Sequence, residues 1–373
     1  MPDEIEAHET MVWEEPAKGG YPDVSLLGLS GQERHRLGRE GRTPHSPMGY
    51  LTELRMTAGS QGHSEFEMPA SRWFANSAGV IAGPLAIIGD AALGSVVHGD
   101  LPRGQVMTTA ELSMTFLRPV LPEAGEAVAG AGQLIHRGRS QGLSEAFMYV
   151  GEDSLVGHGT SRCSVFPPID PVPDAPGELP VLDQRRPGED PQDPLRREPA
   201  GEVLPQSLFD ERSGFEILRG LATGELPQAP IHHLTGLRVV EAAEGEVTMA
   251  LPCSRWLSTS AGTIQGGFTA MLAEAALGAA VFSTVTAGTA TATLDLKVNY
   301  LRPVFPDSED LTARARVLHS GRTIAVAGAR LETAEGKPVA LATGSSMFLP
   351  GRPANLAGVE LATSEPEGAG DPD

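Results

Sequence analysis

The chain has 373 residues, 40% of them hydrophobic, and a net charge of −20. This length suits two domains of about 150 residues each better than one core. The acidic balance excludes a basic surface for nucleic acid or anionic lipid, and Cys163 and Cys253 form neither a disulfide framework nor a metal motif. The first 16 residues are acidic and lack an apolar core. We therefore expect no secretory signal and a cytoplasmic protein.

The predicted elements follow the chain in the same order twice. In each half, two short alternating strands precede a loop with Gly and Ser and then one long apolar helix. The strands are predicted at 51–56 and 65–70, and again at 234–240 and 246–252, and the helices lie in 80–94 and 263–278. Four further strands follow the second helix, at 290–304, 311–321, 323–334 and 338–350. Because each helix is apolar nearly all round, an antiparallel sheet must cover most of its sides.

The two halves match each other motif by motif, with a separation of 183 or 184 positions. The matching pairs are 47–55 and 230–238, 68–81 and 251–264, 90–94 and 274–278, 116–120 and 300–304, and 135–139 and 318–322. A deletion of one residue near Ala82–Pro84 explains the change of register. The chain is therefore a duplication of one domain.

Composition places the boundaries of the two repeats. We expect domain 1 at 26–167 and domain 2 at 206–350, joined by a connector at 168–205 that is rich in Pro and mixed charge. Residues 1–25 and the acidic tail 351–373 are expected to be unstructured.

One apolar stretch, residues 266–285, is long enough to span a bilayer. It has Glu274 at mid-length, several Thr and Gly, and neither a basic flank nor an aromatic belt. We therefore expect a buried helix and no membrane partner.

Each apolar helix contains a single acid. Glu274 is the only charged residue between Arg255 and Asp295, and Asp90 occupies the matching place in the first repeat. Burying a carboxylate is costly unless something offsets the cost. One such acid could be a satisfied structural group, but the same choice made twice favours function. A buried carboxylate has a raised pKa and can deprotonate water or attack a thioester directly, and the sequence leaves both mechanisms open.

The start of the second helix is a Gly-Gly pair, Gly266-Gly267. Unpaired N–H groups and the helix dipole at such a start favour a developing negative charge, such as a thioester oxyanion. In the first repeat the matching Gly83 is followed by Pro84, which has no N–H to donate.

These residues resemble the hotdog-fold acyl-CoA thioesterases of the phenylacetate-degradation (PaaI-like) type. That family has an Asn, then His-Gly-Gly at the helix start, then an Asp or Glu on the helix, and later an aromatic-Leu-Arg-Pro strand end. Both repeats are similar to this pattern, although Gln265 stands at the His position of the second repeat and Ala82 or Ile81 at that of the first. The resemblance implies an α+β fold of two hotdog domains, each a long central helix wrapped by an antiparallel sheet, paired as an intramolecular pseudo-dimer.

The resemblance also implies two unequal composite sites, each taking its helix start from one repeat and its acid from the other. The first would join Asn76 and Gly83 with Glu274 and Thr293. The second would join Thr259, Gln265 and the Gly266-Gly267 start with Asp90 and Thr109. Asn76 matches the carbonyl-orienting Asn of the family, whereas Thr259 replaces it in the second repeat. Neither site is complete, and we expect at least one to be active.

Basic residues form islands in this acidic chain, and Arg can bind phosphates through two parallel hydrogen bonds. We expect possible contacts to the phosphates of coenzyme A from Arg118, Arg302, His136, Arg139, His319 and Arg322. Solvated hairpin turns are the alternative.

The function expected is hydrolysis of an acyl-CoA thioester, with no cofactor and no metal, and with self-association of the double hotdog as a dimer. A non-catalytic acyl-CoA-binding or regulatory protein is the main alternative. A hotdog dehydratase or hydratase is less favoured, because such enzymes need a catalytic His near an acid and neither helix start has one. The acyl group and the pathway are left open.

Overall fold

The computed structural model describes residues 11–122, 125–151 and 154–358. The first repeat contains three short 3₁₀ turns, three α-helices and six strands. They are η1 (Val12–Glu14), η2 (Val24–Gly28), α1 (Gly31–Arg39), α2 (Pro47–Thr52), β1 (Arg55–Ser60), β2 (His63–Pro69), η3 (Arg72–Phe74), α3 (Leu85–Gly99), β3 (Met107–Phe116), β4 (Ala127–Arg137), β5 (Gln141–Val150) and β6 (Ser154–Val165).

The second repeat has the same plan after the connector and its turn η4 (Pro194–Arg196). Its elements are α4 (Gln206–Glu211), α5 (Gly214–Thr223), α6 (Pro230–Thr235), β7 (Arg238–Ala243), β8 (Glu246–Leu251), η5 (Arg255–Leu257), α7 (Gly266–Phe282), β9 (Thr289–Tyr300), β10 (Leu311–Ser320), β11 (Ile324–Glu332) and β12 (Pro338–Pro350).

All twelve strands form one antiparallel sheet in the order β1-β2-β4-β5-β6-β3-β9-β12-β11-β10-β8-β7. The two halves of this order are mirror images, and β3 pairs with β9 at their junction. Pairing these two strands removes a sheet edge that each repeat would otherwise expose. The expected pseudo-dimer, with the sheets joined edge to edge, is thus confirmed.

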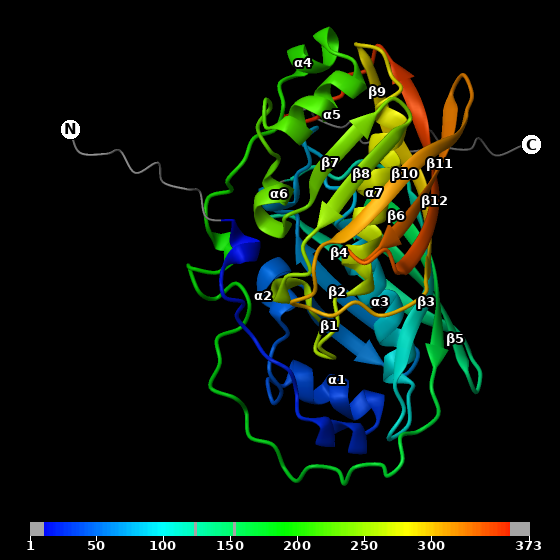
Figure 1. Cartoon of the computed structure of the whole chain (residues 1–373). Helices are drawn as coiled ribbons and strands as arrows, with labels where there is room; N and C mark the ends of the chain where they lie inside the picture. The colour runs from blue at the N-terminus through cyan, green and yellow to red at the C-terminus, as the bar shows by residue number, and fades with distance from the viewer. Residues whose placement is uncertain (1–10, 123–124, 152–153, 359–373) are drawn as a thin grey trace, which may run out of the picture.

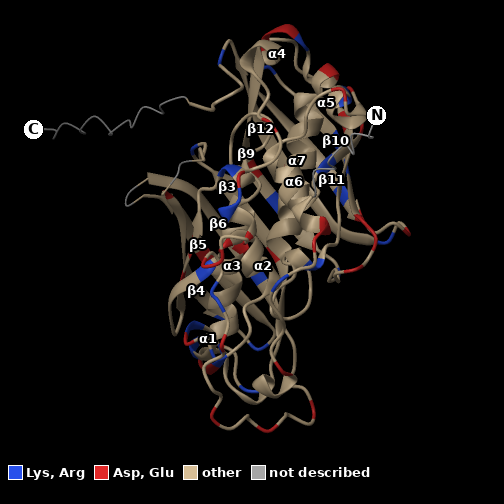
Figure 2. Ribbon diagram, turned by 90° about the vertical axis from the view of Figure 1, so that its left-hand side faces the viewer, with Lys and Arg blue, Asp and Glu red and all other residues tan. Residues whose placement is uncertain are grey.

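Helices α3 and α7 lie side by side against the sheet and contact each other (Figure 1). Most of their residues are buried, as their apolar composition predicted. Figure 2 shows that Lys, Arg, Asp and Glu lie mainly outside these central helices. The close approach of the two helices requires Gly267, because a Cβ atom there would stand 2.6 Å from the carbonyl oxygen of Ala86.

The predicted strand at 51–56 is wrong at its start, as is its counterpart from 234. Residues up to Thr52 and Thr235 form the short helices α2 and α6 instead, each with Pro at its first position. Each Thr hydroxyl is buried and bonds to the carbonyl oxygen four residues earlier, and the helix ends where the next residue, Glu53 or Gly236, takes a left-handed conformation. The alternation of polar and apolar residues was too short to separate strand from helix.

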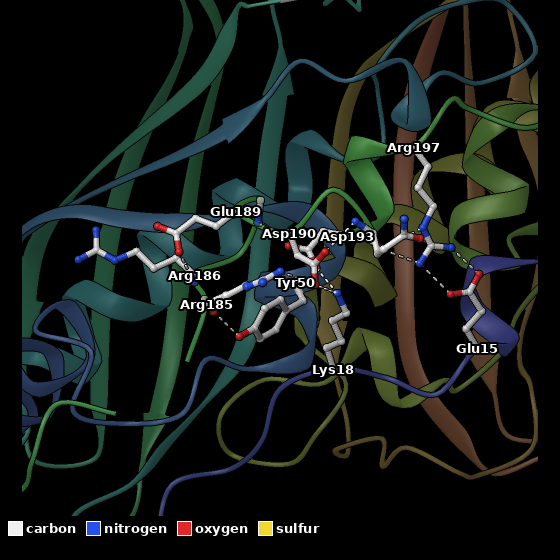
Figure 3. A network of polar contacts seen from close by, with 11 residues as sticks. Glu15, Lys18, Tyr50, Arg185, Arg186, Glu189, Asp190, Asp193 and Arg197 are labelled. Carbon is white, nitrogen blue, oxygen red and sulfur yellow. Dashed lines mark hydrogen bonds and ion pairs between the residues drawn. The ribbon is translucent and has the colours of Figure 1, made fainter. Parts of the chain in front are cut away.

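The connector from 168 to 205 follows the outside of the molecule between the repeats (Figure 1) and is held there by ion pairs. Lys18 Nζ lies 2.6 Å from an oxygen of the fully buried Asp193 and 3.1 Å from Asp190. Arg197 binds Glu15 (Figure 3). Ion pairs therefore hold the N-terminal segment and the connector against each other.

Residues 11–25 also differ from the expectation of an unstructured N-terminus. Val12 is buried, and the carbonyl oxygens of Trp13 and Glu15 accept hydrogen bonds from Ser254 and Trp256 of the second repeat. After β12, Asn355 and Leu356 bond to Leu204 and Ala78, so part of the expected unstructured tail is also bound to the protein, while 1–10 and 359–373 lie outside the described residues.

Among the helices of the described ranges, none combines the length and the apolar character that a bilayer crossing needs.

Candidate active site between the two repeats

Asp90 lies in the middle of α3, and its carboxylate faces the start of α7 in the other repeat. Its Oδ2 atom accepts a hydrogen bond from the backbone N–H of Gly267 at 3.1 Å, and its Oδ1 atom accepts one from the hydroxyl of Thr109 at 3.1 Å. The side chain is buried, with 7% of the residue exposed. The site is therefore a composite of α3 and β3 from one repeat and α7 from the other.

The first turn of α7 presents a further donor beside this carboxylate. Gly266 is its first residue, and the N–H of Gly266 has no hydrogen-bond partner among the described residues. Tyr300 donates its hydroxyl to the carbonyl oxygen of Gly266 at 2.8 Å, which fixes the next peptide unit, the one whose N–H is bonded to Asp90. The unpaired amide of Gly266 at the helix start can stabilise an oxyanion.

Gln265, at the position of the family's His, precedes this start and is buried. Its Nε2 donates to the carbonyl oxygen of Ile87 at 2.9 Å and ties the loop before α7 to α3. Its Oε1 is buried without a hydrogen-bond partner. An unsatisfied buried acceptor at the edge of a cavity can receive a hydrogen bond from a ligand or from water.

Burial raises the pKa of Asp90 from 3.8 to about 6, while the hydrogen bonds from Thr109 and Gly267 oppose that rise. A carboxylate with this pKa is mostly ionised at pH 7 and still basic enough to take a proton from water. Burial also raises the pKa of Tyr300 well above its usual value, with Asp90 and Glu111 adding to the effect. Tyr300 therefore stays neutral and donates.

A cavity of about 1920 Å³ opens at this site. Asp90, Thr109, Gln265, Gly266 and Tyr300 all line it. Its other walls come from α1, α2, β1, β2 and residues 186–189 and 195–199 of the connector. Its size exceeds that of an ordinary small-molecule pocket, so a long ligand with an extended carrier group can be accommodated.

Exposed arginines without a described acidic partner lie in the wall of the cavity, which also contains acids such as Glu189 and Glu198. Thr259 lies there, its hydroxyl accepting a hydrogen bond from the N–H of Ala261 at 3.1 Å. Arg72, Arg186 and Arg302 line the cavity, are exposed, and make no ion pair with a described residue. Of the basic residues singled out in the sequence, Arg302 is thus the one at this cavity. The others are exposed elsewhere: Arg118 near Ser154, and His136, Arg139, His319 and Arg322 at the β4–β5 and β10–β11 hairpins.

Glu274 occupies the matching place on α7, but its surroundings differ. Its Oε1 accepts a hydrogen bond from the hydroxyl of Thr293 at 2.7 Å, and burial raises its pKa. Its Oε2 lies 3.3 Å from the place where a Cβ of Gly83 would stand. Of the four residues expected together, Gly83, Glu274 and Thr293 are thus close to one another, yet none of the four lines the large cavity.

The start of α3 is built differently from that of α7. The helix begins at Leu85 after Pro84, and the N–H groups of Leu85 and Ala86 bond to the carbonyl oxygens of Ala82 and Gly83. This tight turn pairs the first two N–H groups of the helix, while the N–H of Gly83, before the proline, has no partner among the described residues. Pro84 also has no N–H to donate, which is a further difference between the starts of α3 and α7.

Asn76 is bound within its own loop. Its Oδ1 accepts hydrogen bonds from the N–H groups of Ala78 and Val80 at 2.9 and 3.1 Å. Leu204 and Leu356 in turn donate their N–H groups to the carbonyl oxygens of Ser77 and Ala78. The connector and the residues after β12 therefore cover the loop that would lead to Glu274.

Sequence reasoning missed Tyr300 and the connector as parts of the site. The aromatic-Leu-Arg-Pro motif contains Tyr300, so a signal for it was present. Nothing in the composition of 186–199 indicates a cavity wall. Within the described ranges no group of three or more His, Cys, Asp or Glu side chains could hold a metal ion.

Comparison with known proteins adds a family and a fold. The family described as "Thioesterase superfamily" matches residues 261–340. No curated protein matches the chain. A tesB protein of Mycobacterium avium subsp. paratuberculosis is 14% identical, with a TM-score of 0.51, over 82% of this chain and 98% of its own. A hot dog fold protein of unknown function from Alicyclobacillus acidocaldarius is 11% identical, with a TM-score of 0.50, over 81% and 97%.

At these identities the two structures establish the fold and nothing more. They cover both repeats, so the chain contains the hotdog fold twice, and its residues 261–340 are similar to the thioesterase superfamily.

Proposed function

We propose that the protein hydrolyses an acyl-CoA thioester at the composite site around Asp90. The observation that supports this most is the juxtaposition across the repeat interface of a buried carboxylate and a helix start. Asp90 is bonded to Gly267, the N–H of Gly266 is unpartnered, and both groups border one cavity. The thioesterase match at 261–340 includes this helix start.

In the reaction proposed, the thioester carbonyl oxygen accepts a hydrogen bond from the N–H of Gly266, aided by the helix dipole. Asp90 takes a proton from a water molecule, whose oxygen attacks the carbonyl carbon. When the tetrahedral intermediate collapses, the C–S bond breaks and the thiolate of coenzyme A takes the proton from Asp90. Thr109 and Gly267 hold the carboxylate in place throughout.

Direct attack by Asp90 on the carbonyl carbon, through an acyl-enzyme anhydride, is the alternative mechanism. Hydrolysis in ¹⁸O-labelled water under single-turnover conditions separates the two. If Asp90 acts as a general base, the ¹⁸O of the attacking water enters the acid product in the first turnover. If an anhydride forms and water attacks its Asp90 carbonyl, the ¹⁸O enters Asp90 instead.

We assign the activity to Asp90 and not to Glu274, because the cavity reaches only the former and the loop of Asn76 is covered. The test is hydrolysis of a panel of acyl-CoAs by the wild type, Asp90→Asn and Glu274→Gln. Activity lost in Asp90→Asn alone supports the proposal. Failure of the wild type to hydrolyse any member, while still binding coenzyme A thioethers, would favour a non-catalytic acyl-CoA-binding protein.

A further inference from the structure

The wall of the cavity continues past Asp90 along α3 as far as a polar cluster at His98. Ala91, Gly94 and Ser95 line it between Asp90 and His98. These side chains are small, so they leave room for a ligand along this side of the helix. His98 follows Asp90 by eight positions, a distance of about 12 Å along an α-helix.

Two histidines line this end of the cavity wall. His98 Nδ1 and His35 Nε2 share a hydrogen bond of 2.8 Å, and both residues line the cavity. Burial lowers the pKa of His35 to about 4, with Arg39 and Arg34 adding to the effect, and it lowers the pKa of His98 further. Both rings are therefore neutral at pH 7. Two neutral rings hold two protons, of which one lies in the shared bond and the other remains on an outer nitrogen as a donor.

Arg34 brings a positive charge to the same end. It lines the cavity next to His35 on α1, and it forms no ion pair with a described residue. Its Nη2 makes one long bond, 3.4 Å, to the carbonyl oxygen of Gln105, while its Nε is buried without a partner. Asp100, two residues after His98, is paired with Arg137. A half-buried cation without an anion is unfavourable, so this end of the cavity is suited to a negatively charged ligand.

The second repeat shows that the fold does not need these charges. The capping boxes at Ser30 and Ser213 set the register of α1 and α5, 183 positions apart. In that register Arg34 and His35 correspond to Ile217 and Leu218, both buried in the core.

Phe282 takes the place of His98, and it packs against Phe209 with ring centroids 6.2 Å apart. In both repeats a glycine, Gly31 or Gly214, brings the short helix against the end of the long one. The polar cluster is therefore present in repeat 1 and absent from the matching place in repeat 2, and it lies on the side of the cavity.

We infer that Arg34, His35 and His98 bind a carboxylate at the far end of the acyl chain, so that the substrate is the CoA monothioester of a dicarboxylic acid. The inference rests on the proposed acyl-CoA site. Three bonds of an extended chain span ~3.3–3.6 Å, so a distance of about 12 Å corresponds to a chain of about ten bonds. Coenzyme A phosphates are the other source of an anion. The exposed Arg72, Arg186 and Arg302 in the cavity wall suit these phosphates better than the half-buried Arg34 does.

The test compares 9-carboxynonanoyl-CoA with decanoyl-CoA, which differ only at the chain end. The variant Arg34→Ile/His35→Leu/His98→Phe places the residues of repeat 2 in repeat 1. We expect the ratio of kcat/KM for the carboxylated to the plain substrate to exceed one in the wild type. The variant should lower that ratio about 10- to 100-fold, the effect of losing charge-assisted hydrogen bonds.

Two single variants keep the test decisive if the triple variant misfolds. Arg34→Gln removes the positive charge, and this single change should by itself lower the ratio of kcat/KM for the carboxylated to the plain substrate. Arg36→Gln is the matched control, because Arg36 lies on the same helix, pairs with the exposed Glu40 and does not line the cavity. It should leave the ratio unchanged.

Binding of the thioethers S-(9-carboxynonyl)-CoA and S-decyl-CoA, measured by calorimetry, separates this inference from the proposed function. Selective binding of the carboxylated thioether without hydrolysis would overturn the proposed hydrolysis alone. Hydrolysis with an equal ratio in the wild type and in Arg34→Gln would overturn the inference alone. If Arg34→Gln lowers kcat/KM equally for 9-carboxynonanoyl-CoA and decanoyl-CoA, the cluster binds a phosphate of coenzyme A or supports the packing of α1. That result would also overturn the inference.

Discussion

The Oδ2 atom of Asp90 lies 3.1 Å from the backbone nitrogen of Gly267, although the two residues are 177 positions apart in the chain. This hydrogen bond joins the middle of one central helix to the start of the other. It fixes a buried carboxylate beside a helix start whose next N–H, that of Gly266, is unpartnered. The opposite acid, Glu274, has a hydroxyl partner but no such helix start.

Replacing the two acids separately should give unequal results. Asp90→Asn keeps the side-chain volume but removes the base or nucleophile, so kcat should fall about 10²–10⁴-fold. Glu274→Gln should retain activity within about twofold and leave the melting temperature unchanged or raised, because it removes a buried charge. Steady-state hydrolysis and calorimetric melting of both variants measure this. Loss of activity in Glu274→Gln alone would move the active site to the other acid.

The pH dependence of activity should follow the protonation of the Asp90 carboxylate. Because its pKa is about 6, kcat/KM should fall below about pH 6 as the carboxylate becomes protonated.

Stability should change in the opposite direction. The native state binds the proton of Asp90 more tightly than the unfolded state does, so stability falls as pH rises from about 4 to about 6. This contribution is of the order of a few kcal/mol, and Asp90→Asn should remove it. Urea unfolding of both proteins between pH 4 and 7 measures the difference. Parallel pH profiles would contradict a raised pKa at Asp90.

Gly267→Ala should disturb the interface between the repeats. The added Cβ would stand 2.6 Å from the carbonyl oxygen of Ala86 and from the Cα of Ile87, and backbone atoms cannot move aside cheaply. Overpacking of this kind costs about 1–3 kcal/mol, and displacement of the helix start from Asp90 should lower kcat as well. Gly177→Ala is the control, since no atom lies within 4 Å of a Cβ there. Equal melting temperatures for the two variants would contradict this account.

Cutting the connector should leave the repeats together. A protease site introduced at Gly177 lies in a part of the connector without helix or strand. The β3–β9 pairing and the contact of α3 with α7 should hold the cut halves in one species on gel filtration. Separation of the halves after cleavage would show that the connector itself holds them together.

Loosening the anchored part of the connector should affect binding instead. Asp193→Asn weakens the ion pair with Lys18 and the bond from the N–H of Gly188, both of which position the cavity wall. We expect KM to rise about two- to tenfold, the equivalent of up to about 1.4 kcal/mol, with kcat little changed. Lys18→Arg, which keeps the charge, should show a smaller effect. An unchanged KM in Asp193→Asn would separate the connector from the site.

The sequence by itself determined the duplication, the two central helices and the positions of both acids. Those features follow from patterns in the sequence: motifs that match in order at a separation of 183 or 184 positions, apolar residues on every side of a helix, and one carboxylate in each helix. The likeness of the two halves also predicted that they would pair, because identical domains with exposed sheet edges bury them against each other.

Only the tertiary structure decided how the two acids differ. Asp90 and Glu274 have nearly the same neighbours in sequence. Their surroundings, however, come from segments far away: the free start of α7 and the open cavity for Asp90, and Leu204 and Leu356 over the loop of Asn76 for Glu274. Ion pairs that hold the connector join residues far apart in the chain, such as Lys18 and Asp193, which are 175 positions apart. No local pattern encodes such contacts, because they depend on which surfaces the folded repeats bring together.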